Sequence, residues 1–316
     1  MTRVLRIVFM GTPDFAVASL KVLVAHDYNI VGVITAPDKP AGRGRKLSSS
    51  PVKVYAESIG LNVMQPSNLK SEAFLEELRS LKANLQIVVA FRMLPKSVWQ
   101  MPQYGTFNLH ASLLPDYRGA APINWALING EKRTGVTTFF IDENIDTGEL
   151  ILQEEIAIED HDNAGSLHDK LMILGSELVL KTTALIGSGQ VETHPQSEKT
   201  EIRTAHKLNK DNCKIDWNAP MEAIHNKIRG LDPYPAAWCY LKNKGQKVEV
   251  KIYDAVKVHD THELQIGSIN TTKMDILVAV ENGFLKIRAI KLPGKRKMDS
   301  KSLLNGYKFD LNAKML

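Results

Sequence analysis

Short apolar runs alternate with amphipathic segments of helical period through the first 190 residues of the chain. Val4–Met10 and Ile30–Ile34 have the apolar, β-branched composition of buried strands. Thr12-Pro13 and Ser50-Pro51 each place an N-cap residue before a proline that suits the first helical position. Repeated strand–helix units predict an α/β fold with an open, mostly parallel, Rossmann-like sheet covered by helices on both faces. We expect further strands at 62–64, 85–91, 105–111, 136–141 and 149–158, and helices at 15–25, 51–59, 71–81, 122–128 and 164–186.

The pattern changes after Gly187–Ala205, a polar stretch with the Gly, Ser, Pro and Glu residues that are typical of linkers. A short amphipathic segment at 221–229 precedes five strand-like runs separated by polar turns. Several short strands of this kind favour a small β-barrel, and we expect one of the OB type. The strand-like runs are 237–241, 248–253, 263–269, 276–280 and 284–290. The expected division is a domain at 1–187, a linker at 188–206 and a second domain at 207–316.

Composition favours a globular protein of about two domains, because 44% of the 316 residues are hydrophobic and 24% are charged. The longest apolar runs, such as 85–91, are far shorter than the roughly 20 residues of a membrane-spanning helix. Arg6 interrupts the first apolar run, which makes it a poor signal peptide. Cys213 and Cys239 have no metal-binding spacing, so we expect reduced thiols in a soluble, cytoplasmic protein.

The positive charge is concentrated in the last third of the chain. Residues 206–316 contain 20 Lys and Arg against 12 Asp and Glu, whereas residues 1–205 contain 20 against 23. A basic domain joined to a nearly neutral one favours a polyanionic partner such as nucleic acid. A solvated, lysine-rich face is the alternative that composition alone leaves open.

Asn108 and His110 are the best candidates for catalysis. They lie two residues apart on a predicted strand, so their side chains leave the same face of the sheet. An amide donor beside an imidazole suits the stabilisation of an oxyanion during proton transfer. The next strand is followed by Asp146, which we expect at the same sheet edge as His110. Taken separately, a strand-end histidine and an Asp-Thr-Gly turn are also common structural features.

A second informative region is the loop at 38–53, which contains Pro40, Gly42 and Gly44. It carries five basic residues against one acidic residue, Asp38. Such a loop needs either solvent or an anionic partner, and the sequence alone allows both. The basic residues are Lys39, Arg43, Arg45, Lys46 and Lys53.

Four motifs resemble those of the 10-formyltetrahydrofolate-dependent formyltransferases. They are Asn108-x-His110, Ser112-Leu-Leu-Pro115, Tyr117-Arg-Gly-Ala-Ala-Pro122 and Asp146-Thr-Gly148. Four further segments are similar to the branch that acts on methionyl-tRNA: the opening segment at 9–15, the loop Pro37-Asp-Lys-Pro-Ala-Gly-Arg-Gly-Arg45, Ile215-Asp-Trp217 and Gly294-Lys-x-Lys297. The resemblance covers essentially the whole chain. One segment, Ala90–Pro95, is a residue shorter than in many members.

The resemblance implies the formyltransferase fold, with a folate-binding catalytic domain at 1–187. Asn108 and His110 would stabilise the oxyanion while the amino group of methionine, esterified to initiator tRNA, attacks the formyl carbon of 10-formyltetrahydrofolate. Asp146 would tune His110 and help to remove the amine proton. The co-substrate is already an activated amide, so no metal is required. The folate would be held by Ser112, Leu113, Leu114 and Pro115.

The same resemblance implies that the loop at 38–53 enters the acceptor end of the tRNA. Arg43 is the best candidate for reading it, since a guanidinium can contact phosphate and base edges and can stack on a base. Arg45 and Lys46 would assist it, and the barrel would bind tRNA as well. We expect a monomer. The barrel candidates are Lys207, Lys210, Lys242, Lys244, Lys247, Lys295, Arg296 and Lys297.

Other functions are possible. A related formyltransferase would act on a nucleotide-linked amino sugar or a purine precursor, and a formyltetrahydrofolate hydrolase would use water as the acceptor. A nucleic-acid-binding module without catalysis is a further alternative. A nicotinamide enzyme is disfavoured, because Gly11-Thr-Pro-Asp is not a G-x-G-x-x-G motif. Asp160-His-Asp162 and the run at 259–263 contain metal-ligand types without a closed ligand set.

Overall fold

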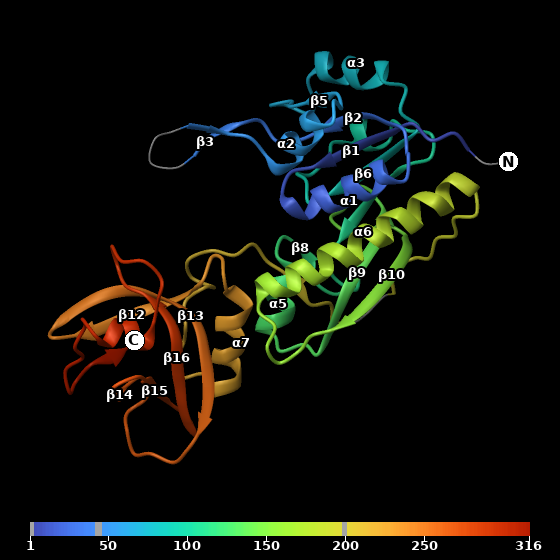
Figure 1. The fold of residues 1–316 in the computed structure, drawn as a ribbon. Helices are drawn as coiled ribbons and strands as arrows, with labels where there is room; N and C mark the ends of the chain where they lie inside the picture. Colours follow the sequence, from blue (N-terminus) through green and yellow to red (C-terminus); the bar gives the residue numbers. More distant parts are fainter. Residues whose placement is uncertain (1–2, 42–45, 198–200) are drawn as a thin grey trace. The chain divides into compact units, whose positions relative to one another are not determined.

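The computed structural model describes residues 3–41, 46–197 and 201–316, which form two compact units (Figure 1). The first unit comprises Met1–Arg118, Thr134–Ile156 and His168–Thr204. The second comprises Gly119–Arg133, Ala157–Leu167 and Ala205–Leu316. Two short segments, Gly119–Arg133 and Ala157–Leu167, therefore group with the C-terminal residues, from which they are separated in the sequence.

The first unit contains the predicted α/β sheet. Its strands are β1 (Ile7–Gly11), β2 (Ile30–Ile34), β5 (Val63–Met64), β6 (Leu85–Val89), β7 (Thr106–His110), β9 (Arg133–Phe140) and β10 (Leu150–Ala157). They are ordered β10-β9-β7-β6-β1-β2-β5. The pairs β5–β2, β2–β1, β1–β6 and β6–β7 are parallel, whereas β9 runs antiparallel to β7. The expectation of an open, mostly parallel sheet is confirmed.

The helices begin close to the predicted positions. Ser50 caps α2, because its Oγ accepts a hydrogen bond of 3.1 Å from the amide of Lys53 while Pro51 occupies the first turn. The prediction for Thr12 is wrong: Pro13 is itself the N-cap of α1 and makes no side-chain capping bond. The helices are α1 (Asp14–Ala25), α2 (Pro51–Ser58), α3 (Glu72–Ser80), α4 (Lys96–Trp99), α5 (Pro122–Ile128), α6 (Ala164–Ser188), α7 (Met221–Leu231) and α8 (Ser300–Leu304).

The two faces of the sheet are covered by different helices. Val8 and Met10 of β1 pack with side chains of α3. The parallel register pairs Met10 with Val88 and Val88 with Asn108, so Asn108 and His110 project from the same face. The opposite face is covered by α6, where a Cβ on Gly175 would lie 2.8 Å from the Leu109 side chain. This close packing of α6 holds β7 in place on the face opposite Asn108 and His110.

The length and composition of α6 would suffice to cross a membrane. Half of its apolar stretch is nevertheless buried within the protein, as expected of a core helix. Thr182 of α6 also shares a hydrogen bond of 2.8 Å with Thr138 of β9, and the helix lies along the sheet in Figure 1. These contacts make α6 part of the core of the sheet domain.

The second unit contains an antiparallel, barrel-like sheet. Its strands are β12 (Ala237–Asn243), β13 (Gln246–His259), β14 (Ile269–Thr271), β15 (Ile276–Val280), β16 (Gly283–Lys291), β17 (Met298–Asp299) and β18 (Lys314–Met315). The order is β14-β15-β16-β13-β12-β18, with β17 paired to β16. A bridge between Ser268 and Lys314 joins the two ends of this order, which nearly closes the barrel.

Two short strand pairs lie outside these sheets. They are β3 (Lys39–Ala41) with β4 (Lys46–Ser48), and β8 (Arg118–Gly119) with β11 (Thr204–Ala205).

The strand predicted at 263–269 is wrong. Most of this segment is a loop, and only its last residue, Ile269, begins β14. Next to it, the ring of His262 stacks near Phe284 and its Nε2 contacts the carbonyls of Val280 and Gly283. The His262 side chain therefore holds the start of the loop, and backbone hydrogen bonds of Gly267 and Ser268 with Ala279 hold its end.

Both cysteines lie in the core of the barrel, and we expect them to resist modification. Burial raises the pKa of Cys239 to about 12 and also raises the pKa of Cys213. Because the thiolate is the reactive form, an aromatic disulfide reagent at pH 8 should find no rapidly reacting thiol in the folded protein. In denaturant it should titrate both thiols. Rapid reaction of either thiol without denaturant would contradict the described burial.

Candidate active site

His110 and Asp146 come together in the first unit. Nδ1 of His110 lies 3.8 Å from Oδ2 of Asp146, and the two side chains are only 7% and 14% exposed. Nε2 of His110 lies 2.8 Å from the backbone carbonyl of Tyr117. Because a carbonyl only accepts, Nε2 must carry a proton, which leaves Nδ1 to hold or release a proton opposite the carboxylate. The distance of 3.8 Å is longer than a hydrogen bond, so the pair has room to tighten on a reacting group.

Asn108 supplies a donor beside this pair. It precedes His110 by two residues on β7 and projects from the same face. Its half-buried side-chain amide makes no hydrogen bond within residues 3–41, 46–197 and 201–316. The amide is therefore available to an oxygen atom of a bound molecule. An available amide next to an imidazole and a carboxylate suits acyl transfer.

Asp146 reaches His110 by a route that the sequence pattern did not predict. Since β9 is antiparallel to β7, its last residue, Phe140, lies opposite Phe107 at the start of β7. The carboxyl end of β9 therefore lies beside the start of β7, at the opposite end of the strands from His110. The loop between β9 and β10 has to fold back across the sheet to bring Asp146 to the imidazole. Asp146 itself has a φ of +56°, in the left-handed region.

The turn at 112–115 is fixed by two side chains from β9 and β10. Thr137 Oγ1 donates to the Ser112 carbonyl at 2.6 Å and accepts from the Leu114 amide at 3.2 Å. Gln153 Nε2 donates to the Leu114 carbonyl at 2.9 Å and to Thr137 Oγ1 at 3.0 Å. Ser112, Leu114 and Pro115 are buried, and Leu113 is partly exposed. The backbone of the turn is largely satisfied internally, which makes its shape rigid.

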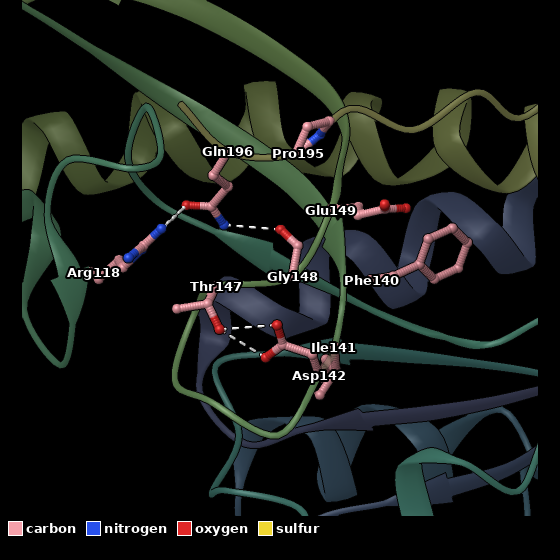
Figure 2. Close-up of a pocket in the computed structure, with 9 residues that line it drawn as sticks. All are labelled: Arg118, Phe140, Ile141, Asp142, Thr147, Gly148, Glu149, Pro195 and Gln196. Carbon is pink, nitrogen blue, oxygen red and sulfur yellow. Dashed lines mark hydrogen bonds between the residues drawn. The ribbon is translucent and has the colours of Figure 1, made fainter. Parts of the chain in front are cut away.

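A cavity of about 340 Å³ lies beside the loop that carries Asp146 (Figure 2). Arg118 enters it from β8, and Gln196 enters it from the segment after α6. Thr147 Oγ1 donates to the Asp142 carboxylate at 2.8 and 2.9 Å, which closes the loop on itself. The residues that line the cavity are Arg118, Phe140, Ile141, Asp142, Thr147, Gly148, Glu149, Pro195 and Gln196.

Comparison with known proteins identifies the family. The formyl transferase profile matches residues 5–183, and the profile of the formyl transferase C-terminal domain matches residues 207–308. A methionyl-tRNA formyltransferase of Flavobacterium johnsoniae is 57% identical over 98% of this chain and 99% of its own length. The chain belongs to the methionyl-tRNA formyltransferase family. Relatives of the same name from Parabacteroides distasonis and Bacteroides thetaiotaomicron are 56% and 52% identical over 96% and 98% of both chains.

Solved structures share the fold of this methionyl-tRNA formyltransferase family member. An N-formyltransferase from Helicobacter canadensis, in complex with folinic acid and dTDP-3-aminofucose, has a TM-score of 0.67 at 22% identity and covers 90% of this chain and 98% of its own. WlaRD, a sugar 3N-formyl transferase, has a TM-score of 0.64 at 20% identity and covers 93% and 100%. The formyltransferase fold expected from the sequence is confirmed.

In this family member, the base of the loop at 38–53 is held by an ion pair. Lys53 Nζ lies 2.6 Å from Asp38 Oδ2, and Gln65 donates to the other carboxylate oxygen at 2.8 Å. The lysine and the glutamine hold the pKa of Asp38 below its usual range, and Asp38 raises the pKa of Lys53. Lys53 is therefore engaged inside the protein rather than free for a partner. Lys46 begins β4, and Arg43 and Arg45 lie outside the described residues.

Lysines gather around two aromatic rings on β12. Lys210 Nζ lies 4.9 Å from the ring centre of Trp238, and Lys247 Nζ lies 4.1 Å from that of Tyr240. Lys214 lies 5.9 and 5.7 Å from the same two rings. Lys210 and Lys247 were predicted from the sequence, whereas Lys214 was missed, since its only signal is its place directly before Ile215-Asp-Trp217. We call Lys210, Lys214 and Lys247 the β12 lysine cluster.

Of the other basic residues predicted on the barrel, Lys242 is paired with Lys247 across β12 and β13, and Lys244 lies in the turn between these strands. The turn with Lys297 lies apart from this cluster. Lys297 Nζ lies 3.4 Å from Asp232 and 4.5 Å from the ring centre of Tyr253. Tyr253 is six residues from Lys247 on β13, roughly 20 Å along an extended strand. Lys295 and Arg296 precede Lys297 and are exposed, as are Lys207, Lys242 and Lys244. The barrel thus presents at least two separate basic areas.

The acidic and histidine residues do not gather into a metal-binding group. Within the described ranges there is no cluster of three or more His, Cys, Asp or Glu side chains arranged to hold an ion. Asp162, from the discounted Asp160-His-Asp162 run, instead accepts a hydrogen bond from the Glu159 amide at 2.8 Å. This residue stabilises a turn.

Proposed function

We propose that this protein transfers the formyl group of 10-formyltetrahydrofolate to the amino group of methionine on initiator tRNA. The observation that carries the proposal is the His110–Asp146 pair beside the available amide of Asn108. Its family is named for this reaction. We also propose that the protein is a monomer. Two buried thiols with no disulfide support a cytoplasmic location.

In the proposed reaction, the methionyl amine attacks the formyl carbon and the carbonyl oxygen becomes negatively charged. The Asn108 amide and the His110 ring stabilise this oxyanion by hydrogen bonding, while Asp146 accepts the proton that the amine loses, directly or through water. The C–N bond to the folate then breaks, and tetrahydrofolate takes up a proton as it leaves. The burial of His110 and Asp146 strengthens these interactions, because few water molecules compete for them.

The folate is proposed to bind at the turn formed by Ser112, Leu113, Leu114 and Pro115, within a catalytic domain at 1–187. Three backbone groups of this turn are occupied by Thr137 and Gln153. The partly exposed Leu113 is therefore the residue of the turn most open to a ligand. The residues 188–206 would connect this domain to a tRNA-binding domain at 207–316.

The tRNA is proposed to bind to the basic loop of the first unit and to the basic surface of the barrel. Arg43, Arg45 and Lys46 of the loop at 38–53 would approach the acceptor end, where an arginine can stack on an unpaired base. The β12 lysine cluster and the turn with Lys295, Arg296 and Lys297 would bind phosphates, together with Lys207. Of these, Lys210 is also paired with Glu249 at 2.8 Å, so its phosphate contact would have to replace an ion pair.

Release of tetrahydrofolate in the presence of different acceptors tests this function. We expect charged initiator tRNA to stimulate release at least about a hundredfold over water, since the bound amine is positioned for attack. Uncharged initiator tRNA, glycinamide ribonucleotide and a dTDP-linked amino sugar serve as controls and should give the rate seen with water. Equal release with water would favour a hydrolase, and stimulation by the sugar would favour the sugar-modifying alternative.

Replacing Gln153 by alanine should raise the KM for 10-formyltetrahydrofolate about five- to thirtyfold. The variant loses the hydrogen bond to the Leu114 carbonyl and the one that orients Thr137, and each is worth about 1 kcal/mol. The KM for charged tRNA should stay within about twofold. Initial rates with each substrate varied in turn measure both values, and the exposed Gln103 replaced by alanine is the control. An unchanged KM for the folate would contradict the proposed binding site.

A further inference from the structure

The segment expected to serve only as a linker contributes a residue to the active-site loop. Gln196, half-buried in the segment after α6, donates from Nε2 to the backbone carbonyls of Asp146 at 2.8 Å and Gly148 at 2.9 Å. Its Oε1 accepts from Arg118 Nε at 3.1 Å and from Nη2 at 2.5 Å. Figure 2 shows this side chain between Arg118 and the loop. One amide therefore joins three segments that are far apart in the sequence.

The chemistry of these groups fixes the orientation of the Gln196 amide. A guanidinium only donates hydrogen bonds, so it has to face the amide oxygen. Backbone carbonyls only accept, so they have to face the amide nitrogen. A glutamate at this position would keep the contact with Arg118 but would present oxygen to the two carbonyls. Arg118, the arginine of the Tyr117-Arg-Gly motif, thus orients Gln196.

The loop that carries Asp146 needs such support. Asp146 has a φ of +56°, which costs a non-glycine residue about 1 kcal/mol or more. The residues at 143–145 are exposed, and the loop holds itself together on one side through Asp142 and Thr147. Gln196 holds it on the other side, at the carbonyl of the catalytic candidate itself.

We propose that Gln196, oriented by Arg118, is a positioning residue that fixes the Asp146 carboxylate opposite His110. This inference rests on the proposed function. A displacement of about 1 Å at a catalytic group can cost about a hundredfold in rate. Gln196→Ala should therefore lower kcat for formyl transfer about ten- to a hundredfold, with both KM values within about twofold. Gln196→Glu should lower kcat at least as much, although it retains the contact with Arg118.

The decisive test is a double-mutant cycle with Asp146. In an Asp146→Asn background, Gln196→Ala should change single-turnover formyl transfer by less than about twofold, because the group that it positions has lost its charge. If Gln196→Ala has its full effect in that background, Gln196 does not act through Asp146 and the inference is wrong. Gln190→Ala is the matched control, because Gln190 lies in the same segment, is exposed, and forms its hydrogen bonds with Ser188 and Leu185 at the end of α6. It should leave kcat unchanged.

Hydrogen exchange separates this inference from the proposed function, since it needs no substrate. Gln196→Ala and Gln196→Glu should each speed amide exchange at 142–148 by at least about threefold, with no change in the strands and none with Gln190→Ala. Unchanged exchange in this loop would overturn the inference whatever the wild-type activity. Faster exchange in the variants of a wild-type protein that does not formylate methionyl-tRNA would support the positioning role and overturn only the function.

Discussion

Replacing either Asn108 or His110 by alanine is expected to lower the turnover number for methionyl-tRNA formylation at least about a hundredfold. Removing one hydrogen-bond donor to an oxyanion costs about 10²–10³ in rate, and removing a positioned acid or base costs about 10²–10⁴. Both side chains project from one face of β7, with no hydrogen bond to the Asn108 amide within the described residues to compete with a substrate. Single-turnover rates at saturating substrate measure the effect.

The affinity for initiator tRNA should change by less than about twofold in the same variants, because neither residue is proposed to bind phosphate. Asn270→Ala and His26→Ala are suitable controls, since they remove the same side chains at exposed positions and should leave turnover unchanged. Near-normal turnover of Asn108→Ala or His110→Ala would refute the catalytic assignment. A loss of tRNA affinity that matches the loss of turnover would also refute it.

The affinity for initiator tRNA is expected to fall steeply with salt, by about 10³–10⁵ between 50 and 200 mM if six to ten phosphates are contacted. The expectation follows from the excess of basic over acidic residues at 206–316, 20 against 12, and from the basic loop. Exposed barrel lysines such as Lys207, Lys242 and Lys247 can replace counterions at the phosphates. Binding isotherms at four or more salt concentrations give the slope of log Kd against log salt.

Substitutions in the β12 lysine cluster refine this test. Lys247→Gln should reduce the slope by roughly one, the amount expected for one phosphate contact. Lys70→Gln, at an exposed position on the other unit, should leave the slope unchanged. A slope near zero for the wild-type protein would contradict the electrostatic surface as a whole. If the wild-type protein has the expected slope and Lys247→Gln does not change it, Lys247 does not contact a phosphate of the tRNA.

Elements with strong local signals were predictable from the sequence. The strand Ile30–Ile34 and the helix Pro122–Ile128 are observed with the predicted bounds, because a β-branched run and a helix-starting proline act through the nearest residues. The segment at 263–269 was mispredicted as a strand, because its conformation depends on contacts with residues distant in sequence, such as those of His262 with Val280 and Gly283. Contacts between residues distant in the sequence cannot be predicted from local composition.

The candidate site also depends on contacts between distant residues that the sequence patterns did not predict. The approach of Asp146 to His110 was expected, but on the assumption that β9 is parallel to β7, and it is antiparallel. Gln153 and Gln196 were missed because their hydrogen bonds join residues 39 and 50 positions apart, in segments that read as an edge strand and a linker. Motifs therefore located the reacting groups, whereas only the folded chain reveals the side chains that hold them in place.

The mass of the aminoacyl product after a single turnover tests the central claim most directly. Purified protein in excess is mixed with 10-formyltetrahydrofolate and initiator tRNA charged with methionine. The aminoacyl group is then released from the tRNA, and its mass is measured by mass spectrometry. We predict N-formylmethionine in an amount equal to the tetrahydrofolate formed. Unmodified methionine, with the formyl group recovered as formate, would contradict the account.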